Sequence, residues 1–162
     1  MIGYDDDTAQ LFLQKLSDVY RYMTINVKKN MVSVAEEIEF TKTYFYLMKI
    51  RFGENVILEV DVSGASLSKA IPPITLQLLV ENAIKHNIAS SSKPLIIKIA
   101  NNGHDYLKVT NTLQRLNFNV PSTSTGMKNV EDRYRLLTDQ LPKVTECSEL
   151  YTVCVPLIKL EE

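Results

Sequence analysis

One stretch constrains the fold most, Ile71–Asn87, which reads IPPITLQLLVENAIKHN. Its two prolines suit the entrance of a helix, because proline at the first helical position has no N–H to lose and already has a helical φ. At 100° per residue, Lys85 and His86 fall within about 60° of Asn82, Glu81 flanks them, and apolar residues lie largely on the opposite side. The spacing therefore predicts a helix with one packing face and one polar face.

Two interpretations of this polar face follow from the spacing. Asn82, Lys85 and His86 could form one end of a nucleotide site, with Glu81 beside them. Alternatively, Glu81 and Lys85 could form an i,i+4 surface pair, worth about a few tenths of a kcal/mol, with Asn82 as a solvated neighbour. Spacing alone leaves both open.

Length and composition exclude several classes of protein. The 162 residues make about one domain, which is enough for a hydrophobic core. With 23% charged residues, 45% hydrophobic residues and a net charge of −1, neither disorder nor a nucleic acid partner is expected. No apolar run approaches the ~18 residues of a membrane span, and the N-terminus has no signal layout, so we expect a cytoplasmic chain without membrane contact of its own.

The two cysteines, Cys147 and Cys154, do not indicate a metal site. They lack CxxC spacing and a clustered histidine, so zinc is not expected. The pair could face one another across a hairpin, but we expect both to be thiols buried as small hydrophobic residues, as in a cytosolic protein.

Two amphipathic helices are predicted in the first third of the chain. From Thr8 to about Lys28, apolar residues recur with helical spacing. The S-x-x-E pattern from Ser33 to Glu36 is a capping box that predicts the start of a second helix, and Gly53 is placed to end it. We expect an antiparallel pair, whose apolar stripes could cover the domain's own core or associate with a second chain.

The rest of the chain is predicted to mix strands and helices. The expected order is strand 56–62, a helix from the two prolines to about 89, strands 95–100 and 106–111, polar segment 114–125, helix 126–138, and strands 141–147 and 151–158. The polar segment has no hydrophobic period, as expected for a lid. The order predicts an α+β fold, a two-layer α/β sandwich with helices on one face of a mixed sheet, preceded by the helical pair.

The stretch Ile71–Asn87 resembles the N box of LytS-like sensor histidine kinases, typically LQPLVENAIKHG, within the superfamily of gyrase, chaperone, kinase and MutL ATPases. Six consecutive residues, Glu81–His86, match that box, as do Gln77 and the prolines. The resemblance extends to LSDVYRY at 16–22, EEIEF at 36–40, YFYLMKIRFG at 44–53, and Arg133, Tyr134 and Leu136 of the ERY-LL ending. It implies the Bergerat-type ATP-binding fold.

The resemblance also implies roles for individual residues. Asn82 would coordinate Mg²⁺ bridging the phosphates of ATP, and Lys85 and His86 would meet phosphate oxygens. Glu81 would orient metal-bound water or hold Lys85, which makes Glu81 and Lys85 the candidate catalytic residues.

Two other family motifs are present in altered form. At the strand end that recognises adenine, the family usually has Asp followed two residues later by Gly, and this chain has Asn111 and Leu113. The side-chain oxygen of Asn111 can still accept a hydrogen bond from the adenine amino group, without the charge. In the G-x-G-L-x-N box, Ser124 replaces the first glycine and Gly126 remains, which implies phosphate contact at a helix N-terminus, with Lys128 adding charge.

The resemblance implies the ATP-binding catalytic region of a two-component sensor histidine kinase. In that family the phosphoacceptor histidine lies upstream in a PHFLFN-like motif, whereas this chain lacks the motif and has no histidine before His86. We expect a helical dimerisation segment without the acceptor at 1–53 and the ATP-binding domain at 54–162. The start MIGYDDD reads like a cut in a longer inner-membrane sensor, whose partners would be ATP with Mg²⁺, a response regulator and a second copy of the full-length protein.

A second interpretation keeps the fold and drops the catalysis. The changes at Asn111, Leu113 and Ser124 would then leave a weak nucleotide binder used for dimerisation or regulation. An ATPase or serine kinase of the same superfamily fits less well, because the N box and the RF pair resemble LytS-like kinases more closely.

Overall fold

The structure is a computed structural model that describes residues 6–114 and 125–160. Its helices are α1 (Asp6–Asn26), α2 (Val34–Phe52), α3 (Thr75–His86) and α4 (Thr125–Arg135), with 3₁₀ turns η1 (Gly53–Asn55) and η2 (Gly64–Ser68). Its strands are β1 (Val32–Ser33), β2 (Val56–Asp61), β3 (Ala70–Ile71), β4 (Leu95–Asn102), β5 (Tyr106–Thr112), β6 (Lys143–Glu146) and β7 (Leu150–Pro156). No helix among these is long and apolar enough to cross a membrane.

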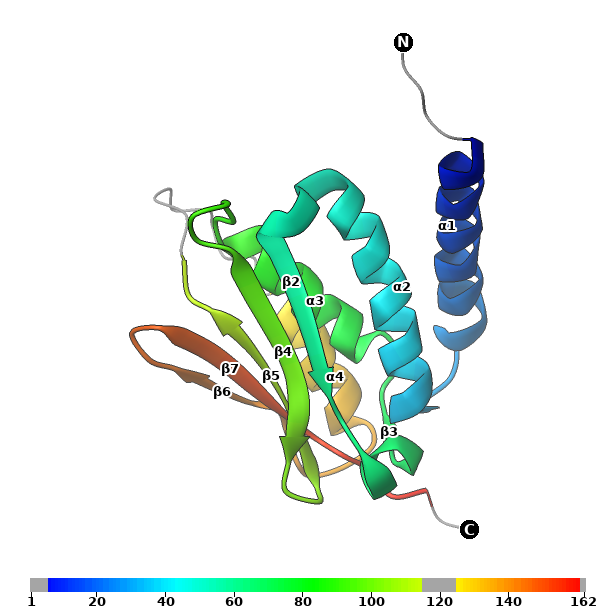
Figure 1. Ribbon diagram of the computed structural model, residues 1–162. Coiled ribbons are helices and arrows are strands. Elements are labelled where there is room, and N and C mark those ends of the chain that lie inside the picture. The colour runs from blue at the N-terminus through cyan, green and yellow to red at the C-terminus, as the bar shows by residue number, and fades with distance from the viewer. Residues whose placement is uncertain (1–5, 115–124, 161–162) are drawn as a thin grey trace.

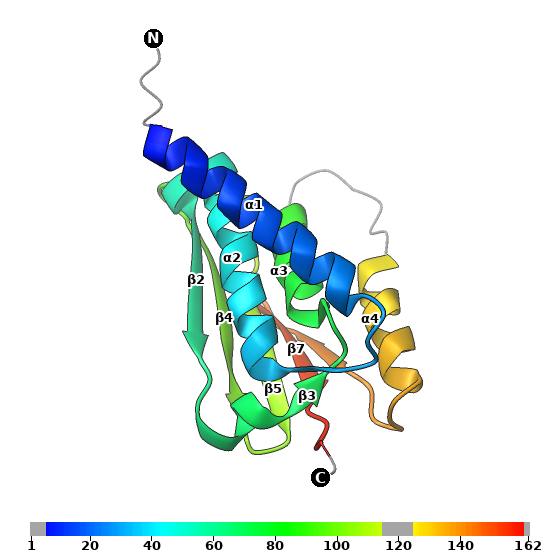
Figure 2. The same ribbon diagram turned by 90° about the vertical axis from the view of Figure 1, so that its right-hand side faces the viewer.

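The main sheet is mixed and carries its helices on one face. Its strand order is β2-β4-β5-β7-β6, with β2 parallel to β4 and the other neighbours antiparallel. Helices α2, α3 and α4 lie together against this sheet (Figure 1), and α1 lies outside them across α2 (Figure 2). The predicted α+β sandwich with a preceding helical pair is confirmed.

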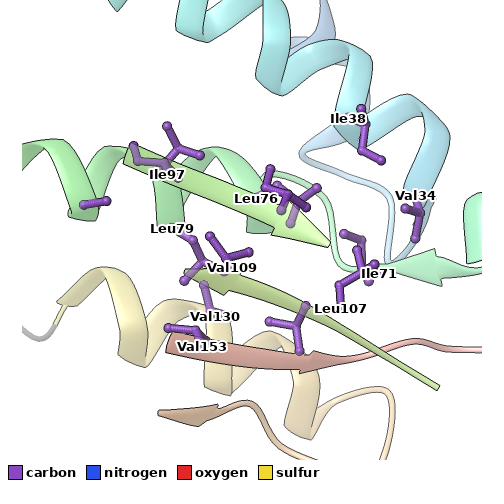
Figure 3. Close-up of a cluster of buried hydrophobic side chains, with 14 of the residues drawn as sticks. Val34, Ile38, Ile71, Leu76, Leu79, Ile97, Leu107, Val109, Val130 and Val153 are labelled. Atoms are coloured by element: carbon purple, nitrogen blue, oxygen red, sulfur yellow. The ribbon is translucent and has the colours of Figure 1, made fainter. Parts of the chain in front are cut away.

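The core fills the space between the sheet and the three inner helices. Alternate residues of β4 and β5 point toward the helices, and the inward ones are buried. Burying each such apolar side chain stabilises the fold by about 1.5–3 kcal/mol. Figure 3 shows this cluster, which includes Val34 and Ile38 of α2, Leu76 and Leu79 of α3, Val130 of α4, and Ile97, Leu107, Val109 and Val153 of the sheet.

The ends of α2 follow the sequence prediction. The Ser33 hydroxyl accepts a hydrogen bond from the backbone N–H of Glu36 at 3.1 Å, which is the N-cap half of the predicted capping box. At the other end Gly53 has a φ of 64°, and its N–H donates to the Lys49 carbonyl.

The start of α3 differs from the prediction that the prolines open the helix. Strand β3 pairs with β1 up to Ile71, and the Thr75 hydroxyl donates to the Pro72 carbonyl at 2.6 Å, so the prolines lie in a turn before the helix. Between them and Thr75, Ile74 has a φ of 69° and a ψ of 7°. A β-branched residue in this left-handed region is strained, typically by about 1–3 kcal/mol, so other contacts must hold it there.

A buried carboxylate holds this turn. Glu37 of α2 is fully buried and accepts hydrogen bonds from the Ile74 N–H at 3.1 Å and the Leu76 N–H at 3.3 Å. The Tyr22 hydroxyl of α1 donates to the same carboxylate at 2.5 Å. Burial raises the pKa of Glu37, and these donors oppose that rise. Glu37 therefore supplies the cap that Ile74, which has no polar side chain, cannot give α3.

The expectation of buried cysteines is wrong for Cys147, which is exposed, and Cys154 is only half-buried. Both belong to the β6–β7 hairpin at the edge of the sheet, and every residue of β6 is exposed. The β6–β7 hairpin projects beyond the helices in Figure 1, which agrees with its exposure to solvent among the described residues. Both thiols are free.

Candidate functional site

Helix α3 has the two faces that its spacing predicts. Its buried side carries Leu76, Leu79, Val80 and Ala83, which join the core. On the other side Glu81 and Lys85 are exposed, and Asn82 and His86 are half-buried. The polar face is therefore in contact with solvent along the second half of the helix.

The structure brings Asn82 together with Gly126, which the sequence placed in a different motif. Gly126 lies in the first turn of α4, and α4 packs beside α3. A Cβ on Gly126 would lie 3.0 Å from both Oδ1 and Nδ2 of Asn82. Backbone N–H groups and the helix dipole favour anions at such a helix start. The asparagine amide and the start of α4 thus form one polar corner, which is suited to phosphate.

Replacing Gly126 with alanine should separate nucleotide affinity from stability. The added Cβ would displace the Asn82 amide, and we expect affinity for an ATP analogue to fall severalfold. The φ of Gly126 is not positive, so alanine suits the helix and stability should not decrease. Fluorescent-nucleotide titration and thermal unfolding would measure the two effects. In an Asn82→Ala background the same change should be stabilising, and a parallel loss of affinity and stability would contradict this account.

Glu81 is oriented toward α2 and not toward Lys85. Its carboxylate accepts a hydrogen bond from Gln77 Nε2 at 2.7 Å. Burial and then the nearby Glu81 carboxylate raise the pKa of Tyr44 on α2. Of the ion pairs within residues 6–114 and 125–160, none joins Glu81 to Lys85. The simple surface-pair interpretation therefore has no support in the structure.

Asn111 lies near the end of β5 and is 4% exposed. It pairs with Ile97 on one side and Tyr151 on the other. Its Nδ2 donates to the Thr112 carbonyl at 2.9 Å, which fixes the orientation of the amide. Leu113, in the place of the family glycine, donates its N–H to the Glu149 carbonyl at 2.9 Å.

A polar contact that no sequence motif predicts joins the end of α3 to the end of β5. Asn87 Oδ1 accepts a hydrogen bond from the Gln114 N–H at 2.8 Å, and Asn87 Nδ2 donates to the Ala83 carbonyl at 2.9 Å. Gln114 Nε2 donates to the carbonyls of Ile88 and Lys93 at 3.0 and 2.7 Å. These contacts fix the strand end that carries Asn111 relative to α3. A polar residue next to a motif gives no sequence signal of such burial.

Two candidate residues from the sequence remain, Lys128 and Ser124. Lys128 is exposed on α4. Ser124 and most of the polar segment predicted as a lid lie outside the described residues.

The side chains around Asn82 suit a metal ion that is coordinated mainly by the oxygens of a bound phosphate and of water. Within the described part of the chain, no three His, Cys, Asp or Glu side chains gather to hold a metal ion. An amide oxygen is a hard ligand of the kind that Mg²⁺ accepts, and Mg²⁺ usually combines one or two protein ligands with phosphate oxygens and water. Asn82 fits that pattern.

A cavity of about 610 Å³ lies elsewhere, between α1 and α2. Its lining residues are Asp18, Tyr22, Ile25, Asn26, Lys29, Ala35, Glu36, Glu39, Phe40 and Thr43. None of them belongs to α3, β5 or α4, so this cavity is separate from the polar corner.

Comparisons with known proteins agree with this fold. The structure of the cytoplasmic segment of histidine kinase QseC has a TM-score of 0.55 and 12% identity, with 100% of this chain and 99% of that chain covered. The chain therefore shares the fold of this histidine kinase segment.

The sequence comparisons find similarity to sensor histidine kinases. The histidine kinase family model matches residues 1–56. The sensor protein LytS of Staphylococcus haemolyticus is 27% identical over 114 residues, which is 70% of this chain and 19% of that protein. An uncharacterized sensor-like histidine kinase of Staphylococcus epidermidis is 34% identical over 99 residues, 61% of this chain and 19% of that protein. The chain is similar in sequence to LytS sensor proteins and related sensor histidine kinases, and it spans about a fifth of the length of these relatives.

Proposed function

We propose that this chain is the ATP-binding catalytic region of a two-component sensor histidine kinase, which supplies the γ-phosphoryl group of ATP to a histidine outside the chain. The observation that carries the proposal is the contact of Asn82 with Gly126. Two motifs that the resemblance assigns to metal and phosphate meet there at the start of a helix. The sequence relationship to LytS sensor proteins supports the same activity.

The residues of the polar face would share the work of binding. Asn82 would hold Mg²⁺, and Lys85 and His86 would meet phosphate oxygens that are bound at the start of α4. Glu81, held by Gln77, would orient a water on the metal. Phosphoryl transfer needs mainly positioning and charge neutralisation, which is the chemistry that these side chains provide.

The other end of the nucleotide would reach the end of β5. Asn111 would recognise adenine there, while Gly126 and Lys128 would contact the phosphates, as would Ser124 of the same box. The hydrogen bond from the Gln114 N–H to Asn87 Oδ1 supports this division, because it joins the strand end that carries Asn111 to the end of α3.

We further propose an organisation in two parts. Residues 1–53 would belong to the dimerisation and phosphoacceptor region, without its histidine, and residues 54–162 would form the ATP-binding domain. In the full-length protein, a cytoplasmic homodimer of this region would phosphorylate a response regulator on behalf of an inner-membrane sensor.

A second candidate function is a non-catalytic nucleotide-binding or dimerisation module of the same fold. The observation that favours it is at the adenine end, where the Asn111 amide is engaged by Thr112 and Leu113 stands in place of glycine. In that case nucleotide affinity would be weak.

Titration of a fluorescent ATP analogue with and without Mg²⁺ tests the proposal. We expect saturable binding that is stronger with Mg²⁺ and is displaced by unlabelled ATP. Weak binding without dependence on Mg²⁺ would favour the non-catalytic module. Absence of binding at near-millimolar protein would contradict the catalytic proposal and leave only the dimerisation module.

A further inference from the structure

The turn before α3 is held from three different helices. Glu37 of α2 binds the N–H groups of Ile74 and Leu76, as described above. Arg133 of α4 donates from Nη1 to the Pro73 carbonyl at 2.5 Å. Because α4 also carries Gly126, this turn links the two helices that form the polar corner.

Helix α1 reaches the same turn through Tyr22. Its hydroxyl donates to Glu37, and its ring stacks on Phe40 of α2 with centroids 4.1 Å apart and an interplanar angle of 12°. Val19 of α1 and Ile74 are buried in one small cluster between α1, α2 and α3. Ile74, the strained residue at the start of α3, therefore shares a buried cluster with α1, and it donates its N–H to the same Glu37 carboxylate that accepts from Tyr22.

We propose that Glu37 is a positioning residue of the nucleotide site, and that Tyr22 makes its hold on α3 depend on the placement of α1. This inference rests on the proposed function. A displacement of α1 would remove the Tyr22 hydroxyl from a carboxylate that has no contact with solvent. Glu37 would then hold Ile74 and Leu76 less firmly, and the strained turn would relax.

The effect would reach the site because a helix moves largely as a rigid element. A shift at the start of α3 changes where Asn82 lies against Gly126 in the next two turns. A looser helix start also adds conformational freedom, which nucleotide binding must remove, so affinity falls without any lost contact to the ligand. Placement of α1 and occupancy of the site are thereby coupled.

Tyr22→Phe tests this coupling, because it removes the hydroxyl and keeps the stacking on Phe40. Tyr20→Phe is the matched control, since Tyr20 lies on the same helix and is 73% exposed. Affinity for a fluorescent ATP analogue with Mg²⁺ should fall about two- to tenfold in Tyr22→Phe, the range that one net hydrogen bond gives. Amide hydrogen exchange by NMR should become faster at Ile74 and Leu76. Tyr20→Phe should match the wild type in both measurements.

The outcomes separate positioning from a merely structural role. Wild-type exchange at Ile74 and Leu76 in Tyr22→Phe would overturn the proposal. Faster exchange with wild-type affinity and unchanged amide shifts at Asn82 would also overturn it, because Tyr22 would then serve stability alone. If the wild type itself binds no nucleotide, the proposed function fails. The exchange rates and the amide shifts of ligand-free α3 would still decide whether Tyr22 and Glu37 place Asn82.

Discussion

Replacing Glu37 with alanine should lower the free energy of unfolding by about 3 kcal/mol or more. The change removes the acceptor for the Tyr22 hydroxyl and for the N–H groups of Ile74 and Leu76, in a place without solvent. Each unpaired buried donor typically costs about 1–3 kcal/mol, and the strained Ile74 loses its support. Urea unfolding followed by circular dichroism would measure the loss.

Glu39→Ala is the matched control, because Glu39 lies two residues further along α2 with a side chain that is 78% exposed. Its ion pair with Lys42 is at the surface, so we expect a change within about 0.5 kcal/mol. Equal losses in the two variants would mean that Glu37 is not the support of α3.

Replacing Asn82 with alanine should remove the dependence of nucleotide binding on Mg²⁺. The Asn82 amide is the protein ligand that we assign to the metal. A polar interaction with a charged group typically changes affinity by about ten- to a hundredfold. Asn82 is half-buried on the polar face, so the fold should remain intact by circular dichroism. The measurement is a titration of a fluorescent ATP analogue with and without Mg²⁺.

The control for this variant is Asn102→Ala. Asn102 is exposed at the end of β4, where its amide contacts Cys154 Sγ at 3.4 Å. It should retain wild-type affinity and the Mg²⁺ effect. Unfolding of Asn82→Ala would show that Asn82 is structural, and an unchanged Mg²⁺ effect would remove it from the metal site.

Local signals in the sequence were sufficient for most of the fold. The capping box at Ser33 and the glycine at Gly53 predicted both ends of α2, because a helix end is decided by a few neighbouring residues. The 3.6-residue period of α3 predicted which side is buried, since the hydrophobic face must meet the core. The hairpin formed by β4 and β5 follows from alternation and the Asn-Gly turn between the strands.

Contacts between distant segments could not be predicted in the same way. Adjacent Glu36 and Glu37 look alike in the sequence, and only the packed structure shows that Glu37 is fully buried at the start of α3. The prolines were predicted as the first helical turn, but the pairing of β3 with β1 delays the helix to Thr75. The contact of Asn82 with Gly126 also depends on how α3 and α4 pack.

The cysteines show that residue type alone does not predict whether a side chain is buried. A free cysteine is usually buried, and this average predicted buried thiols for the hairpin. Cys147 is exposed because it lies at the turn after the exposed edge strand β6, and that edge position depends on the order of strands in the sheet.

Mapping of bound nucleotide by NMR tests the central claim most directly. With Mg²⁺ and a non-hydrolysable ATP analogue, amide shifts should change at the second half of α3, at Gly126 and around Asn111. The residues that line the cavity between α1 and α2 should change little, apart from those next to Tyr22. Shifts that are confined to that cavity, or no shifts at saturating analogue, would contradict the placement of the nucleotide site on α3.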